Sequence, residues 1–140
     1  MVEHRYYRLL HWGDCDPGGI IYSPNYARWL IEGVTNLFIS VGVDPYQLIE
    51  GGMRVGLPVM EQRLRFLTPA VLHDQIEHRV AVAKLGTKSL TFEHRMHARG
   101  ECLMEATDIR VWGVHPVARP LELAARAIPE HIREVLTRNS

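Results

Sequence analysis

The alternation of apolar and polar positions divides the chain into one long helix and a series of strands. From Pro24 onward, apolar residues recur at intervals of three and four, which predicts a buried helical stripe of about seventeen residues. Ser23 is expected to cap this helix, Pro24 to occupy its first position and Gly42 to end it. The stripe consists of Tyr26, Trp29, Leu30, Val34, Leu37, Phe38 and Val41.

Alternation with a period of two predicts strands on both sides of this helix. Before the helix, the segment 5–12 carries large apolar side chains on both of its faces, which favours a strand covered on both sides. After the helix, short breaks separate four further strand-like segments, so successive segments are expected to pair antiparallel. These segments are 59–67, 75–85, 88–98 and 101–114.

The remaining segments connect or close this pattern. Residues 44–54 are interpreted as a connection with a short helical turn at 45–50, and 121–127 and 129–138 as terminal helices. The length favours one domain over residues 1–140, of the α+β class, with one antiparallel sheet covering one dominant helix. Such a sheet has an edge and a face to protect, and dimerisation is a natural way to protect them.

Composition narrows the classes of partner. Lysine and arginine together number 16, as do aspartate and glutamate, so no net charge favours nucleic acid or an anionic membrane. The two cysteines, with no secretory signal, are interpreted as free thiols in a cytoplasmic protein. No apolar run approaches the roughly 20 residues that a membrane-spanning helix requires.

Candidate chemistry concentrates in residues 12–26. Glycines in this segment allow tight turns and close approach of a ligand, and they lie just before a helix N-terminus that can polarise a carbonyl group. Asp14 and Asp16 supply two carboxylates there. The alternative interpretation is that both carboxylates only make Asx-turns, as Asp does in many loops.

The segments 13–20, 22–26 and 28–30 closely resemble the signature of the 4-hydroxybenzoyl-CoA thioesterase family. The similarity continues more weakly at Gly56-x-Pro58 and at Lys88-Ser89. The resemblance implies the hotdog fold, in which an antiparallel sheet of about five strands wraps around a long helix. It also implies hydrolysis of an acyl-CoA thioester by a homodimer or homotetramer, with no metal and no cofactor, coenzyme A being part of the substrate.

The resemblance assigns roles to particular residues. The family's catalytic aspartate falls on Asp16, which either attacks the thioester carbonyl or activates a water. The backbone N–H that binds the thioester oxygen falls on Ser23. Substrate-binding positions of the family fall on Ile31, Leu57, Lys88 and Ser89. Apart from the resemblance, Gly18 and Gly19 are expected to let the substrate carbonyl approach closely, and Tyr22 and Tyr26 are candidates for lining the acyl pocket.

Two departures from the family pattern concern the substrate. The carboxylate that receives a substrate phenol is replaced by Ile31, and the threonine of the Gly-x-Pro motif by Leu57. An unsubstituted aromatic or a medium aliphatic acyl group therefore fits better than a 4-hydroxyl. The turn at 85–87 also lacks the family's basic residues, which leaves Lys88 as the phosphate contact.

Other interpretations stay open. Glu61 is either a catalytic carboxylate acting from a partner subunit or a solvated ion-pair partner. His94 and His97 form an H-x-x-H pair, but on a strand they would lie on opposite faces, which argues against metal binding. Cys15 is interpreted as a packed thiol. A hotdog dehydratase would need a histidine within residues 13–30, which contain none, and a non-catalytic acyl-CoA binder would not need Asp16.

Overall fold

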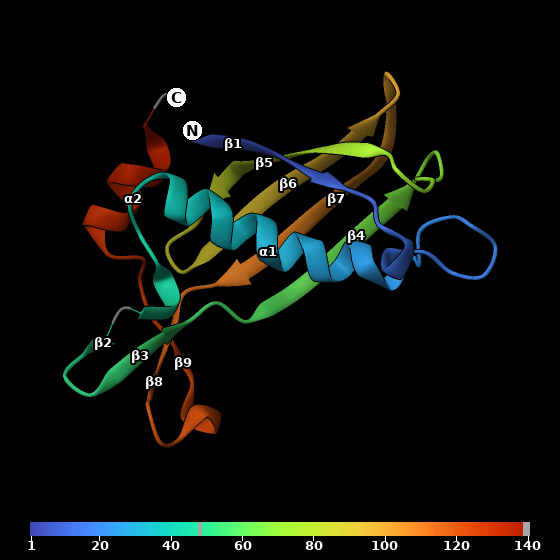
Figure 1. Cartoon of the computed structure of the whole chain (residues 1–140). Coiled ribbons are helices and arrows are strands. Elements are labelled where there is room, and N and C mark those ends of the chain that lie inside the picture. Colours follow the sequence, from blue (N-terminus) through green and yellow to red (C-terminus); the bar gives the residue numbers. More distant parts are fainter. Residues whose placement is uncertain (48, 139–140) are drawn as a thin grey trace.

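A five-stranded antiparallel sheet curves around one long helix, as a computed structural model of the chain shows for residues 1–47 and 49–138 (Figure 1). The strand order in this sheet is β1-β5-β6-β7-β4. Its elements are β1 (Glu3–Leu9), α1 (Pro24–Ser40), β4 (Val59–Phe66), β5 (Gln75–Leu85), β6 (Ser89–Ala98) and β7 (Glu101–Val111). The expected α+β architecture, with about five strands around one helix, is confirmed.

Helix α1 forms where the apolar stripe predicts it. Seven of its residues are buried against the sheet, and Pro24 occupies the first helical position. The helix ends in a Schellman motif, because the Gly42 N–H bonds to the Ile39 carbonyl and the Val43 N–H to the Phe38 carbonyl. Gly42 has a φ of +84°, which a residue without a side chain adopts freely. The predicted C-terminal stop is therefore confirmed.

The inner faces of β5 and β6 follow the predicted alternation. Their inward side chains are buried, and the register sets His78 opposite Met96 and Val80 opposite His94. The two strands are joined by a short turn, as are β6 and β7, so both of these antiparallel pairings are as predicted. The buried inward residues are Ile76, His78, Val80, Val82, Leu90, Phe92, His94 and Met96.

The expected pairing of 59–67 with 75–85 is wrong. Strand β4 pairs with β7 at one edge of the sheet, whereas β5 lies next to β1 near the other edge. Residues 67–74 cross the end of the sheet between them, with the N–H groups of Leu67 and Thr68 bonded to the Leu103 carbonyl. On β4, at this edge of the sheet, Met60 and Phe66 are exposed.

The first strand is shorter and less covered than expected. It ends at Leu9, and residues Trp12–Asp14 form a 3₁₀ turn in which Trp12 is 71% exposed. The side chains of Tyr7 and Leu9 are exposed on the outer face of the sheet. Within one chain, β1 is therefore covered on its inner face only.

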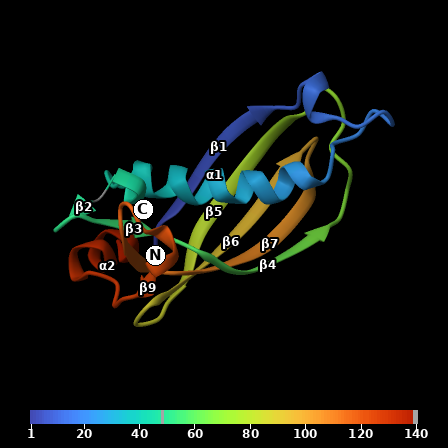
Figure 2. The ribbon, with the colours of Figure 1, turned by 90° about the horizontal axis from the view of Figure 1, so that it is seen from below.

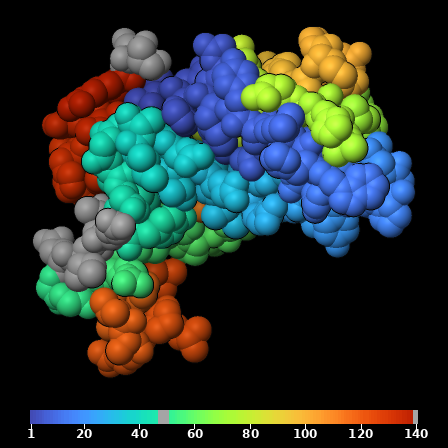
Figure 3. Space-filling view, in the orientation of Figure 1, coloured from blue at the N-terminus to red at the C-terminus, as the bar shows by residue number. Residues whose placement is uncertain are grey.

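A second, smaller sheet projects beyond the first. Its strand order is β2-β3-β8-β9, with β2 (Ile49–Glu50), β3 (Met53–Gly56), β8 (Gly113–Pro116) and β9 (Ala124–Ala125) (Figures 1 and 3). The predicted strand 101–114 is thus divided at Trp112 between the two sheets. The helix expected at 121–127 is wrong, because this segment contains the end of a 3₁₀ turn (Pro120–Glu122) and then β9, which pairs with Gly113 and Val114.

The predicted last helix is confirmed as α2 (Glu130–Thr137). It returns to the start of the chain, where the Val2 N–H bonds to the Leu136 carbonyl. The helical turn expected at 45–50 is a 3₁₀ turn over Pro45–Gln47 followed by β2, and Leu48 lies outside the described residues. Neither α1 nor α2 is long and apolar enough to cross a membrane.

Candidate active site

Residues 14–22 form a small hairpin that leads directly into α1. The Tyr22 N–H bonds to the Asp14 carbonyl at 2.8 Å, Cys15 and Ile21 form a bridge, and the Asp16 N–H bonds to the Ile20 carbonyl at 2.9 Å. This hairpin projects at the end of the sheet opposite α2 (Figure 2). Its second arm docks on the 67–74 segment through the Ile21 N–H and the Ala70 carbonyl.

The Asp16 carboxylate lies at the tip of this hairpin and is partly exposed. Its Oδ1 accepts the Gly18 N–H at 2.8 Å, which is an Asx-turn, and among the described residues no hydrogen bond reaches Oδ2. A Cβ at position 18 would lie 3.0 Å from Oδ1, and Gly19 has a φ of +83°. The two glycines therefore permit the turn that presents Asp16, and one carboxylate oxygen stays available for chemistry.

Asp14 differs from Asp16 in how its carboxylate is used. Its Oδ2 accepts the His11 N–H at 3.0 Å within the Trp12–Asp14 turn. Its carbonyl oxygen accepts two further donors, the Tyr22 N–H and the side-chain amide of Asn25. Asp14 is thus a structural member of the hairpin, which separates it from Asp16.

Ser23 does not cap α1 with its side chain, contrary to expectation. Its backbone is already helical (φ −57°, ψ −32°), and its hydroxyl makes no capping bond. Pro24 has no N–H, and the N–H groups of Asn25 and Tyr26 bond to the carbonyls of Tyr22 and Ser23. At the entry to α1, the Ser23 N–H is left without an acceptor among the described residues. It is therefore a free donor at the positive end of the helix dipole.

The two tyrosines near the hairpin have different surroundings. Tyr22 is exposed beside the loop, whereas Tyr26 is buried between Trp29 and Phe66, with ring centroids 5.9 and 5.5 Å away. Burial, assisted by the negative charge of Asp74, raises the pKa of Tyr26 to about 12. Within one chain, Tyr22 lies at the surface near Asp16 and Tyr26 belongs to the core.

Ile31 lies on the exposed side of α1. It is 44% exposed and follows Ser23 by about two helical turns, or about 12 Å along the axis. The neighbouring Glu32 cannot replace a carboxylate at position 31, because its Oε2 accepts the Arg8 guanidinium at 3.1 Å. The Arg8 guanidinium also stacks 4.2 Å from the centroid of the Trp29 ring. Glu32 is therefore held against β1.

The other expected binding residues lie far from Asp16. Leu57 is 6% exposed in the core around the C-terminal half of α1. Lys88 and Ser89 lie at the β5–β6 turn, at the opposite end of the sheet from the hairpin (Figure 2). Arg133 of α2 joins them, since its guanidinium donates to the Gly86 carbonyl at 2.7 Å. Sequence spacing gave no signal for Arg133, because its approach to this turn depends on where α2 packs.

A chain of polar side chains crosses the core beneath α1. The Tyr6 hydroxyl lies 2.9 Å from His78 Nδ1, His78 Nε2 lies 2.9 Å from His94 Nδ1, and His94 Nε2 lies 3.6 Å from Asp108. Asp108 in turn receives the Arg110 guanidinium through two bonds of 2.9 Å. Because Asp108 only accepts, the proton order that fits the chain has both histidines neutral and protonated on Nε2. At 3.6 Å, His94 Nε2 lies beyond hydrogen-bond distance of Asp108 and has no hydrogen-bond partner among the described residues.

Burial controls the protonation of this chain. It lowers the pKa of His78 to about 2, with the nearby His94 adding to the effect, and it lowers the pKa of His94 against the opposing influence of Asp108. The chain is also tightly enclosed, since a Cβ on Gly33 would lie 2.7 Å from His78 Cε1. No substrate can reach the two histidines without opening the helix–sheet core.

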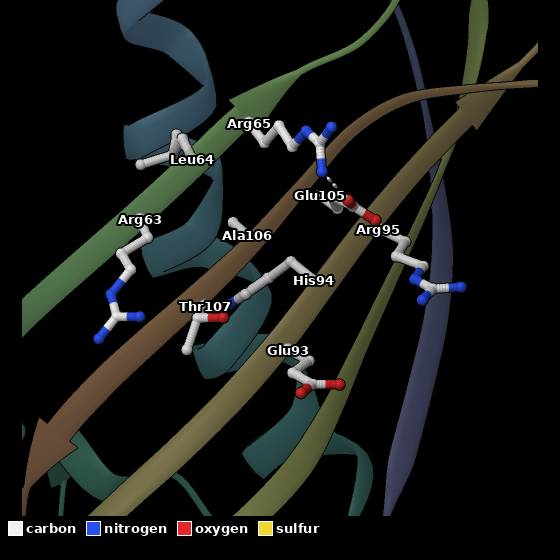
Figure 4. Close-up of a pocket in the computed structure, with 9 residues that line it drawn as sticks. All are labelled: Arg63, Leu64, Arg65, Glu93, His94, Arg95, Glu105, Ala106 and Thr107. Atoms are coloured by element: carbon white, nitrogen blue, oxygen red, sulfur yellow. Dashed lines mark ion pairs between the residues drawn. The ribbon is translucent and has the colours of Figure 1, made fainter.

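A hollow of about 310 Å³ lies on the outer face of the sheet, away from α1 (Figure 4). The side chains that point into it are mostly charged, and the Arg65 guanidinium lies 3.8 Å from the Glu105 carboxylate. Asp16 does not line this hollow, which is poorly suited to an apolar acyl group. Its lining residues are Arg63, Leu64, Arg65, Glu93, His94, Arg95, Glu105, Ala106 and Thr107.

The remaining candidates have simple environments. Glu61 is exposed and bonds to Arg63 at 2.9 Å, which lowers the pKa of Glu61. His94 is buried and His97 only partly buried, in keeping with opposite faces of β6. Cys15 and Cys102 are free thiols. Among residues 1–47 and 49–138, no group of three His, Cys, Asp or Glu side chains could hold a metal ion.

Comparison with known sequences gives two kinds of match. A family model described as the thioesterase-like superfamily matches residues 10–136. The chain is 30% identical over 113 residues to 4-hydroxybenzoyl-CoA thioesterase from Pseudomonas sp. (strain CBS-3), covering 76% of this chain and 79% of that protein. It is 25% identical over 95 residues to 1,4-dihydroxy-2-naphthoyl-CoA hydrolase from Thermosynechococcus vestitus, covering 68% and 64% of the two chains.

Solved structures match over nearly the whole chain. An Asp-to-Asn variant of 4-hydroxybenzoyl-CoA thioesterase complexed with 4-hydroxybenzoyl-CoA is 26% identical, with a TM-score of 0.86 and coverage of 96% of this chain and 99% of that one. A gentisyl-coenzyme A thioesterase is 27% identical, with a TM-score of 0.80 and coverage of 93% and 99%. The family resemblance seen in the sequence and the hotdog fold that it implies are confirmed.

Proposed function

The chain belongs to the thioesterase-like superfamily, and we therefore propose that it hydrolyses acyl thioesters of coenzyme A. One observation carries the proposal. The Asp16 carboxylate, with one oxygen unbonded, lies at the tip of the hairpin, and the unbonded Ser23 N–H lies where the same hairpin enters α1. A base or nucleophile and a free N–H donor are the two groups that thioester hydrolysis requires.

The proposed reaction assigns one role to each group. The Ser23 N–H donates to the thioester oxygen and stabilises its negative charge as the carbonyl carbon becomes tetrahedral, an interaction typically worth about 10²- to 10³-fold in rate. Asp16 takes a proton from the attacking water or attacks the carbonyl carbon itself. The carbon–sulfur bond breaks, the oxygen of water ends in the carboxylic acid, and the coenzyme A thiol leaves. The reaction as proposed uses no metal and no cofactor.

We propose an aromatic, benzoyl-type acyl group along the outward face of α1. The named relatives act on aromatic acyl groups that carry hydroxyls, which supports an aromatic substrate. Here the surface at Ile31 is apolar and Glu32 is bonded to Arg8, so no free carboxylate is available for a phenol hydroxyl. The same exposed isoleucine favours a second candidate, a short or medium aliphatic acyl group.

The coenzyme A end of the substrate requires positive charge, which Lys88 and Arg133 supply at the β5–β6 turn. This turn lies at the opposite end of the sheet from Asp16 (Figure 2). We therefore propose that the working enzyme is a homodimer or homotetramer in which the turn of one copy approaches the hairpin of another. The two free thiols fit a reducing compartment, and we propose the cytoplasm.

The test measures thiol release from benzoyl-CoA, 4-hydroxybenzoyl-CoA and aliphatic acyl-CoAs by the purified protein. We expect benzoyl-CoA to be preferred over its 4-hydroxyl analogue by no more than about 100-fold, because an apolar wall rejects a hydroxyl only weakly. Asp16→Asn should lower kcat by at least about 100-fold with an unchanged thermal unfolding midpoint. Asp44→Asn is the matched control, since Asp44 makes the same kind of turn by accepting the Tyr46 N–H at 3.0 Å.

Three outcomes would contradict the proposal. If Asp16→Asn hydrolyses its best substrate as fast as the parent, the assigned mechanism is wrong. Tight coenzyme A binding without turnover of any thioester would identify a binding module instead. Hydration of an enoyl-CoA would identify a dehydratase.

A further inference from the structure

The Asn25 side chain makes a hydrogen bond beside the hairpin, and the proposed reaction assigns it no role. Its side-chain Nδ2 donates to the Asp14 carbonyl at 2.9 Å, beside the Tyr22 N–H, which donates to the same oxygen at 2.8 Å. Asn25 lies in the first turn of α1 and Asp14 in the first arm of the hairpin. The bond therefore joins two segments that are otherwise connected only around the hairpin tip and through its backbone bonds.

This contact joins the two segments that carry the proposed catalytic groups. Asp16 follows Asp14 by two residues on the first arm, and Ser23 precedes Asn25 by two residues at the helix entry. A shift of the Asp14 carbonyl relative to the helix would change the separation of the Asp16 carboxylate from the Ser23 N–H. A misplacement of about 1 Å between reacting groups can cost about 100-fold in rate.

We propose that Asn25 is a positioning residue that fixes the Asp16 carboxylate relative to the Ser23 N–H, an inference that rests on the proposed function. Its amide is chemically suited to this role, because the Asp14 carbonyl only accepts and requires a donor. An aspartate of the same shape would place a carboxylate oxygen against that carbonyl. Alanine would remove the donor and leave the backbone bond from Tyr22 alone.

The experiment compares Asn25→Ala and Asn25→Asp with the parent and with Ser40→Ala. Ser40 is the matched control. It lies in α1, as Asn25 does, and its side chain also donates to a backbone carbonyl, that of Leu37, but at the end of the helix far from the hairpin. Thiol release gives kcat and KM for the best substrate of the parent, and thermal unfolding gives the midpoint of each variant.

We expect Asn25→Ala to lower kcat by about 10- to 100-fold with KM within about twofold, since alignment and not binding is lost. Asn25→Asp should be similarly impaired at pH 7.5. Its kcat, divided by that of the parent at each pH, should rise as the pH falls toward 5, because a protonated carboxyl group donates to the Asp14 carbonyl again. Ser40→Ala should retain the kcat of the parent.

Two results would overturn the inference while the proposed function stands. One is a kcat of Asn25→Ala within twofold of the parent when Asp16→Asn is impaired. The other is a kcat that falls only in proportion to the unfolded fraction, with a pH-independent ratio for Asn25→Asp. If the parent itself turns over no thioester, the proposed function fails and this inference fails with it.

Discussion

The hairpin at Asp16 and the buried chain from Tyr6 to Arg110 both contain ionisable side chains, but the molecule treats them in opposite ways. The hairpin carboxylate is partly exposed and has one bonded oxygen and one unbonded oxygen. In the buried chain, Asp108 is fully enclosed and both of its oxygens accept bonds from Arg110. The hairpin leaves one carboxylate oxygen free to bind a substrate, whereas the buried chain uses nearly all of its hydrogen-bonding groups within the protein.

The comparison shows why a shifted pKa does not by itself identify a catalytic site. The pKa of His78 is lowered to about 2, a large perturbation that often marks catalytic groups. Here the cause is burial beneath α1, where neither histidine can meet a substrate. Asp16, by contrast, owes its candidacy to an unbonded oxygen and to the free Ser23 N–H at the end of the same hairpin. Access and free bonding capacity are therefore the better guides in this fold.

The largest effect on stability is expected from replacing Arg110 in the buried chain. Replacing Arg110 by Met leaves the Asp108 carboxylate buried without its main counter-charge, which typically costs about 3–5 kcal/mol in the free energy of unfolding. Urea unfolding at pH 7.5 measures this loss. The double variant Asp108→Asn with Arg110→Met should recover most of it, because no lone charge then remains in the core. A single variant as stable as the parent would show that the pair is not held as buried charges.

A second test uses the two buried histidines. Because their pKa is lowered in the folded protein, the unfolded chain binds more protons below about pH 6.5, and the free energy of unfolding decreases as the pH falls. For His78 the expected slope approaches about 1.4 kcal/mol per pH unit between pH 6 and 5, and His94 adds to it in the same direction. Carboxyl groups with a lowered pKa, such as Asp108, lose their contribution only at lower pH.

Urea unfolding at pH 7, 6 and 5 measures this slope, and His78→Gln is the matched variant. Glutamine stays neutral throughout, so the slope should fall by about 1.4 kcal/mol per pH unit. The groups facing the two histidines are His4, Tyr6 and Arg8 on one side and Asp108 and Arg110 on the other. An unchanged slope in His78→Gln would show that other groups cause the pH dependence.

The smallest effect is expected at Glu61. Its carboxylate is exposed and bonded to Arg63 on the same strand, so Glu61→Gln should leave the unfolding midpoint and kcat unchanged. Glu105→Gln is a suitable control, because Glu105 lies 3.8 Å from Arg65 in a similar surface pair. A tenfold or larger loss of kcat in Glu61→Gln alone would place a catalytic carboxylate on β4, acting in a second copy of the chain.

Much of the fold could be predicted because its signals are local. The apolar spacing of three and four and the glycine at position 42 lie within the helix that they define. The inward placement of His78 and His94 also follows from alternation. Their partners do not, because the Tyr6–His78 and His78–His94 contacts join different strands across 72 and 16 positions.

The predictions that failed depend on side-chain hydrogen bonds between residues far apart in the sequence. The short gap after Phe66 suggested adjacent strands, yet the crossing segment is pinned by Asp74, which accepts the Val71 N–H and the Arg99 guanidinium. The sequence also predicted a side-chain cap at Ser23. In the fold, the polar side chain that makes a hydrogen bond at the start of α1 is that of Asn25, and it bonds to the Asp14 carbonyl, not to the helix backbone. The spacing of Ser-Pro-Asn cannot distinguish the two.

Strand β1, which leads into the hairpin, has a consequence for the order in which the molecule opens. Its Tyr6–His78 contact closes a segment of 72 residues, whereas the His78–His94 contact on the same imidazole closes one of 16. By loop-closure entropy alone, the longer segment is about 1.3 kcal/mol harder to close. β1 is also an edge strand, bonded to β5 alone within the sheet. We expect its amides to exchange with deuterium before those of β6, so that the segment carrying Asp16 is released while the central strands remain closed.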